Sequence, residues 1–110
     1  MDKSQIFTNF AVVIHFIGLI RVFMDISVII PLFNEAESLP VLHEWIARVM
    51  REHKYIYEVI FVNDGSTDTS WRVIEELREK DSSVHGICFR RNYGKSAALY
   101  CGFEMAQGDV

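Results

Sequence analysis

The sequence predicts an α/β fold in which helices pack on a parallel β-sheet. Short runs of hydrophobic, β-branched residues, typical of strands buried on both faces, alternate with segments whose hydrophobic residues recur at helical spacing. From residue 26 onward the order is strand then helix, three times over. Because connections between such elements are short and right-handed, we expect the successive strands to lie side by side and parallel.

Strands are expected at residues 26–32, 58–62 and 84–89. The first two, ISVIIPL and EVIFV, are almost continuous hydrophobic runs, and the third, VHGICF, is shorter and less uniform. Asp109 and Val110 look like the start of a further strand. The pattern therefore predicts the N-terminal β-α-β-α-β-α part of a larger sheet.

Helices are expected from residue 39 to 50, from about 71 to 80 and from 96 to 107. Ser38 is a suitable N-cap for the first helix and Asp68 for the second, and Gly108 can close the third. Pro40 falls in a first turn, where a missing backbone N–H is tolerated.

Length, charge and cysteine content narrow the functional classes. The chain has 110 residues, half of them hydrophobic, which is enough for one small core. Its formal charge of -4, with acids and bases interspersed, lacks the basic footprint of nucleic-acid binding, so no nucleic-acid partner is expected. Cys88 and Cys101 have neither disulfide-scaffold nor metal-site spacing, and we expect two reduced core thiols.

Residues 1–24 form an apolar N-terminal extension with two open interpretations. The hydrophobic run 6–23 includes Thr8, Asn9, His15 and Arg21, so it falls short of a spanning helix, and no small-residue cleavage site follows it. The segment is either a helix that binds a membrane surface or a partner, or an upstream extension outside the domain. Met24 would itself serve as a start before the first strand, which favours the second interpretation.

Three loops follow the carboxyl ends of the expected parallel strands, where ligands bind in sheets of this kind. They span residues 33–35, 63–68 and 90–95. The first loop lacks the glycines of a dinucleotide-binding turn. Gly94-Lys95-Ser96 imitates the end of a phosphate loop, but Phe89 stands where that motif requires its first glycine. Both common nucleotide motifs are therefore excluded.

The loops instead combine carboxylates with cations. Glu35 and Asp64 can accept hydrogen bonds from a nucleobase or a ribose, while Lys95, with Arg90 and Arg91, supplies positive charge for a diphosphate. Each residue also has a purely structural interpretation: a solvated acid for Glu35, a turn residue for Asp64, a solvated loop for the cations. The histidines at 43, 53 and 85 have no partner at ligand spacing and are interpreted as structural or surface residues.

Three segments in order, 26–35 (ISVIIPLFNE), 62–68 (VNDGSTD) and 91–98 (RNYGKSAA), resemble glycosyltransferase family 2. The resemblance covers residues 25–110 and is strongest to the polyprenol-phosphate branch, with its dolichol- and undecaprenyl-phosphate sugar transferases. It implies the three-layer, Rossmann-like nucleotide-binding fold called GT-A, of which residues 25–110 would be the N-terminal part. It also implies a nucleotide site. The base and ribose pocket would be lined by Pro31, Phe33, Glu35 and Asp64, and the residues facing the nucleotide and its phosphates would be Asn92, Gly94 and Lys95.

The resemblance further implies an inverting enzyme that transfers a sugar from a UDP- or GDP-sugar to an acceptor at the cytoplasmic face of a membrane. In this branch the implied acceptor is a polyprenyl phosphate. Family members bind Mg²⁺ or Mn²⁺ through an Asp-x-Asp motif on the next strand, so the metal ligands and catalytic residues are expected downstream of Val110 and none is assigned here. We expect this chain alone to be inactive, and marginally stable or self-associated through an unpaired sheet edge. The alternative is a non-catalytic module that keeps only the nucleotide pocket.

Overall fold

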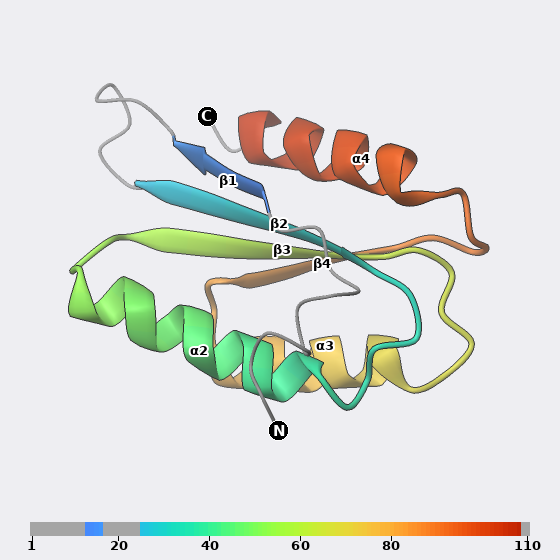
Figure 1. Cartoon of the computed structure of the whole chain (residues 1–110), viewed down its shortest axis with the longest axis horizontal. Coiled ribbons are helices and arrows are strands. Elements are labelled where there is room, and N and C mark those ends of the chain that lie inside the picture. Colours follow the sequence, from blue (N-terminus) through green and yellow to red (C-terminus); the bar gives the residue numbers. More distant parts are fainter. Residues whose placement is uncertain (1–12, 17–24, 109–110) are drawn as a thin grey trace.

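The computed structural model describes residues 13–16 and 25–108, and the side chains of 13–16, 107 and 108 are left aside. Its elements, in order, are β1 (Val13–Phe16), β2 (Ile26–Leu32), α2 (Leu39–Glu52), β3 (Tyr57–Asn63), α3 (Ser70–Lys80), β4 (Val84–Cys88) and α4 (Lys95–Gly108). Figure 1 shows a central sheet with α2 and α3 on one face and α4 on the other. The expected fold class, an α/β sandwich with a parallel sheet, is confirmed.

The parallel part of the sheet joins β2, β3 and β4 in sequence order. Ile29 of β2 pairs with Ile60 of β3, and Val62 of β3 pairs with Ile87 of β4. All three carboxyl ends therefore lie at one edge of the sheet, as the sequence predicts. The predicted strands and helices agree with the structure to within one or two residues at each end. Tyr57 and Asn63 extend β3, Phe89 is not part of β4, and Gly108 is the last helical residue of α4.

A fourth strand, β1, pairs antiparallel with β2 on the side away from β3. Neither interpretation of the N-terminal extension includes this strand, because its hydrophobic run was judged by helix length alone. The run contains β-branched residues, which suit a strand, and β2 offers a free edge to pair with. Residues 1–12 and 17–24 lie outside the described residues, as do Asp109 and Val110, so the remaining predictions for these segments stay predictions.

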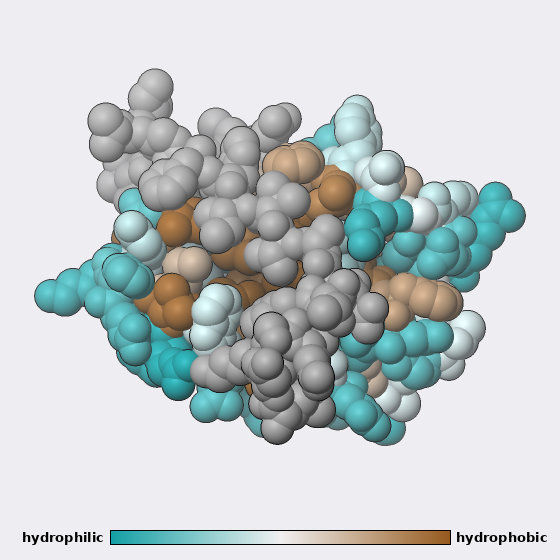
Figure 2. Space-filling model, viewed as in Figure 1, coloured by the Kyte–Doolittle hydropathy of each residue, from teal (hydrophilic) through white to brown (hydrophobic). Residues whose placement is uncertain are grey.

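Alternate residues of the strands build two hydrophobic layers. Val28 and Ile30 of β2 and Phe61 of β3 pack with α2 and α3, whereas Ile29 and Ile60 pack under α4. Burial on both faces explains why the strands read as continuous hydrophobic runs. In Figure 2 hydrophobic side chains gather between the helix layers, and hydrophilic ones dominate the visible outer surface of the helices.

The cysteines differ from the expectation. Both thiols are free, as expected, but Cys88 at the end of β4 is exposed and Cys101 in α4 is half-buried. The prediction of two core thiols is wrong for Cys88, because β4 is an edge strand of the sheet and its last residue lies at the loop end.

A polar cluster links α2 to the amino-terminal end of β3. The Asp81 carboxylate lies 2.9 Å from His43 Nε2 of α2 and accepts a hydrogen bond of 2.9 Å from the Tyr57 hydroxyl of β3. Burial, and then the hydrogen bond and charge of Asp81, raise the pKa of Tyr57 from 10.0 to about 12. The histidine is thus a structural residue, in agreement with the sequence interpretation.

Close packing of α4 on the sheet depends on Gly102. A Cβ at this position would overlap with Ile29 Cγ2 of β2 and crowd Val62 of β3. We predict that Gly102→Ala lowers the free energy of unfolding by about 1 kcal/mol, because overpacking costs about 1–3 kcal/mol and exceeds the gain in helix propensity of up to about 1 kcal/mol. Urea unfolding measures the change. Ser96→Ala, at an exposed position of the same helix, is the control and should change stability little; an equally stable Gly102→Ala would contradict the packing.

The raised pKa of Tyr57 predicts a specific loss of stability in alkali. Below pH 10.0 the phenol is protonated in both states and its bond to Asp81 contributes fully; between pH 10.0 and about 12 the unfolded state ionises first and the contribution is lost. Tyr57→Phe should therefore be less stable than wild type by about 1 kcal/mol below that interval. Across the interval the two urea midpoints should converge. A difference that stays constant with pH would disprove the role of the phenol.

Candidate functional site: a pocket at the strand ends

One pocket lies at the carboxyl edge of the sheet, between the loop after β2 and the start of α4. It has a volume of about 260 Å³. Its lining includes all seven residues that the sequence analysis selected, together with one that it missed, namely Pro31, Leu32, Phe33, Glu35, Asp64, Asn92, Gly94 and Lys95. Residues from the end of β2, the three loops and the start of α4, up to 64 positions apart in the chain, therefore meet at one site. Leu32 was missed because its aliphatic side chain has no polar group and the family resemblance does not imply it.

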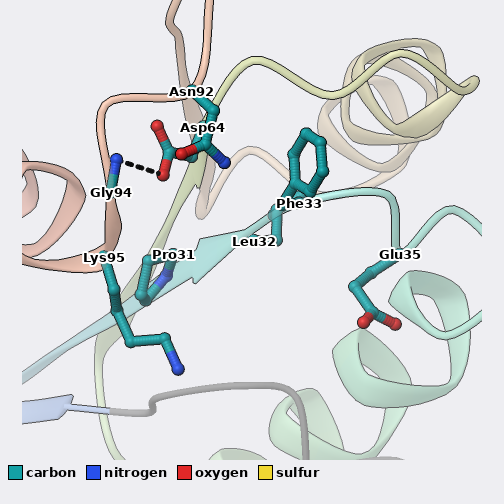
Figure 3. Close-up of a pocket in the computed structure, with 8 residues that line it drawn as sticks. All are labelled: Pro31, Leu32, Phe33, Glu35, Asp64, Asn92, Gly94 and Lys95. Carbon is teal, nitrogen blue, oxygen red and sulfur yellow. Dashed lines mark hydrogen bonds between the residues drawn. The ribbon is translucent and has the colours of Figure 1, made fainter.

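The pocket is mixed in character from end to end. Figure 3 shows Lys95 and Glu35 on opposite sides, with Pro31 and Phe33 between them. Small-molecule sites usually span about 300–1,000 Å³, so this volume suits part of a large ligand, such as a base and ribose. Lys95 is the first residue of α4, where the backbone N–H groups lack intrahelical partners and the helix dipole is positive.

Asp64 holds the third loop in place. Only 4% of this residue is exposed, and its two carboxylate oxygens accept hydrogen bonds from Tyr93 N at 2.7 Å and Gly94 N at 3.0 Å. The second of these bonds is drawn in Figure 3. From the sequence this carboxylate was expected to be a ligand group or a turn residue, and its bonds to the backbone of the third loop were not predicted. A carboxylate has about four lone-pair positions, so two remain for a ligand.

Gly65 brings the second and third loops into backbone contact. Its φ is 75°, a conformation that glycine adopts without strain. A Cβ here would overlap with the backbone of Arg91 and Asn92. Asn63 closes the same turn by accepting a bond of 3.1 Å from Ser66 N. The loop conformation is thus fixed by the backbone as well as by Asp64.

The first loop is tied to the second by side chains that the sequence analysis did not select. Asn34, with φ of 54°, accepts hydrogen bonds from the backbone of Thr67 and Asp68. Asp68 was predicted as the cap of α3, but the N-cap is Thr69, one residue later. Asp68 Oδ1 accepts a hydrogen bond of 2.9 Å from Ser70 N, and Oδ2 accepts one of 3.3 Å from Ala36 N, just after the first loop. The only available signal was the type of Asn34, which tolerates positive φ better than most residues.

Two aromatic side chains near the pocket have different surroundings. Phe33 lines the pocket and is 42% exposed. Tyr93 is 56% exposed, but its ring packs edge-on against Phe89 and lies 4.8 Å from the Arg91 guanidinium. Phe33 therefore offers a ring face to a ligand, whereas Tyr93 and Arg91 are engaged with each other.

Charge on the second loop is stabilised by hydrogen bonds. Although burial alone would raise it, the bonds donated by Ser70 and Ala36 hold the pKa of Asp68 below its ordinary value. The carboxylate therefore stays ionised at neutral pH and can keep both backbone partners.

The described part of the chain contains neither a cluster of metal-binding side chains nor a helix able to span a membrane. Within residues 13–16 and 25–108, no three His, Cys, Asp or Glu side chains come together as a metal site. Divalent-cation ligands of the usual kind are thus not assembled by these residues. Among the same residues, no helix has the length and hydrophobicity needed to cross a bilayer.

Comparison with known proteins gives consistent matches. The model of the family described as Glycosyl transferase family 2 matches residues 27–110. A putative glycosyltransferase, CsbB, of Bacillus subtilis (strain 168) is 42% identical over 85 residues, which is 77% of this chain and 26% of the relative. A bactoprenol glucosyl transferase of Shigella phage SfV is 38% identical over 87 residues, 79% of this chain and 28% of the relative.

A third relative is the undecaprenyl-phosphate 4-deoxy-4-formamido-L-arabinose transferase of Pseudomonas fluorescens (strain SBW25). It is 42% identical over 86 residues, 77% of this chain and 25% of the relative. The chain thus spans about a quarter of the length of these relatives. The names of two of them include bactoprenol or undecaprenyl phosphate, which agrees with the polyprenol-phosphate branch that the motifs resemble.

The matched region contains all three parallel strands and all three pocket loops. By this match the chain belongs to glycosyl transferase family 2.

Proposed function

We propose that this chain forms the donor-nucleotide half of the active site of an inverting glycosyltransferase. The whole enzyme would transfer a sugar from a UDP- or GDP-sugar to a polyprenyl phosphate at the cytoplasmic face of a membrane, in cell-envelope glycan or glycolipid synthesis. The observation that carries the proposal is the meeting of Phe33, Asp64 and Lys95, from three loops, in one pocket of suitable size.

The pocket supplies different groups to different parts of a nucleotide. The exposed ring of Phe33 would stack on the base, and Glu35 with the remaining lone pairs of Asp64 would accept bonds from base or ribose. Lys95 and the positive end of α4 would neutralise a phosphate. Asn92 and Gly94 line the side from which the phosphates would extend toward Lys95.

Metal binding belongs to another part of the proposed enzyme. Members of the family generally use a divalent cation, which stabilises a departing nucleoside diphosphate. The described residues assemble no such site, and none of them is assigned a role in metal binding. A polyprenyl phosphate acceptor is already anionic, so its oxygen can attack the anomeric carbon in line without a general base.

The alternative is a non-catalytic module that binds a nucleotide sugar without turning it over. The coding sequence beyond Val110 separates the two functions. A hydrophobic strand ending in Asp-x-Asp supports the enzyme, whereas a stop codon would exclude catalysis by this gene product.

Substitution of Lys95 should weaken binding of the diphosphate but not of the nucleoside. Lys95→Met removes a charge-assisted contact worth about 1.5–3 kcal/mol, so we expect the Kd for UDP or GDP to rise about tenfold or more. Isothermal titration with UDP, GDP, uridine and guanosine, with Mn²⁺ present, measures the effect. Lys80→Met, at the exposed end of α3, is the matched control. Equal losses for nucleoside and diphosphate would rule out a phosphate contact for Lys95.

Substitution of Phe33 should weaken binding of the nucleoside itself. Stacking of a base on an aromatic ring contributes about 1–3 kcal/mol, so Phe33→Ala should raise the Kd for the preferred nucleoside about five- to a hundredfold. Tyr93→Ala is the control, because that ring is packed against Phe89 and Arg91. The proposal of a base on Phe33 fails if Tyr93→Ala has the larger effect.

A further inference from the structure

Asn34 lies at the centre of the contact between the first two loops. Its Oδ1 accepts hydrogen bonds from Thr67 N at 2.8 Å and Asp68 N at 3.2 Å, and its own N–H donates to Ser66 Oγ at 2.8 Å. Its Nδ2 also lies 3.3 Å from Thr67 Oγ1. One exposed side chain thus accepts hydrogen bonds from two successive backbone N–H groups, which lie 33 and 34 residues further along the chain.

The residues after Asn34 repeat the same connection. Glu35 N donates to Ser70 Oγ at 3.0 Å, and Ala36 N donates to Asp68 Oδ2 at 3.3 Å. Three successive residues, 34–36, are therefore bonded to the segment 66–70. The second loop is in turn bonded to the third through Asp64.

We infer that Asn34 is a positioning residue of the donor site, which sets Phe33 and Glu35 against the pocket without contacting the nucleotide. Asn34 stands between these two pocket residues in the sequence but does not line the pocket. The inference rests on the proposed donor binding and adds to it the residue that orients the base-binding side. Loss of its acceptor removes two of the bonds that hold the first loop and loosens it, whereas Gly94 stays bonded to Asp64.

Two properties of Asn34 can be separated by substitution. Its φ of 54° suits Asn, Asp or Gly, and its Oδ1 is the acceptor for the second loop. Asn34→Gly keeps the backbone conformation and removes the acceptor. Asn34→Asp keeps both the conformation and the acceptor, loses the weak contact of Nδ2 with Thr67 and adds a negative charge near Asp68. The pair isolates the acceptor from the backbone conformation.

The first measurement is amide hydrogen exchange of the ligand-free, full chain. In Asn34→Gly the amides of Thr67 and Asp68 should exchange about tenfold faster than in wild type, because each loses its acceptor. Amides of the β3 core strand should be unchanged, and Asn34→Asp should resemble wild type. Unchanged exchange at Thr67 and Asp68 in Asn34→Gly overturns the inference, whether or not the chain binds a nucleotide.

The second measurement is titration with uridine, guanosine, UDP and GDP. Asn34→Gly should raise the Kd for the preferred nucleoside and for its diphosphate by the same factor, about tenfold, so that their ratio stays at the wild-type value. Asn34→Asp should restore the affinity for the uncharged nucleoside to within about threefold of wild type, since the acceptor is kept. Failure of Asn34→Asp to restore nucleoside binding, or a change in the ratio in Asn34→Gly, overturns the positioning role. If wild type binds none of the four ligands, the donor proposal falls, and hydrogen exchange alone decides whether Asn34 holds the loop.

Discussion

The carboxylate of Asp64 is the interaction on which the site depends. It stands directly after β3, is almost fully buried, and uses both oxygens to hold the backbone of Tyr93 and Gly94. A buried carboxylate is costly unless hydrogen bonds satisfy it, so the folded chain favours the loop position that supplies these two donors. The start of α4, with Lys95, is therefore located by the residue that follows β3.

Local patterns were sufficient to predict most of the fold. The runs at β2 and β3 read as buried strands because both of their faces are covered, and the helical spacing in α2 and α3 matches the face that each buries. Parallel order then placed three loops at one edge, which is why residues as distant as Glu35 and Lys95 could be assigned to the same site before their positions were known.

Contacts between distant segments account for what could not be predicted. The type of Asp64 indicates an acceptor, but not that its donors are the amides of residues 93 and 94. Asn34 resembles an ordinary turn residue until Thr67 and Asp68 are found beside it. Similarly, strand β1 forms where β2 leaves an edge free, and a hydrophobic run of its length does not specify that partner.

The position of the pocket follows from a change of sheet face along the chain. After β2 and β3 the chain turns to the face covered by α2 and α3, but after β4 it turns to the opposite face, and α4 passes over β3 and β2 (Figure 1). The loop after Leu32 and the start of α4 therefore diverge from the same sheet edge toward opposite faces, which opens a crevice between them. Gly102 sets how closely α4 lies on Ile29, and Asp64 fixes Gly94 just before the helix begins. Because α4 is held both along its length and at its start, the Lys95 side of the crevice is defined by the sheet itself.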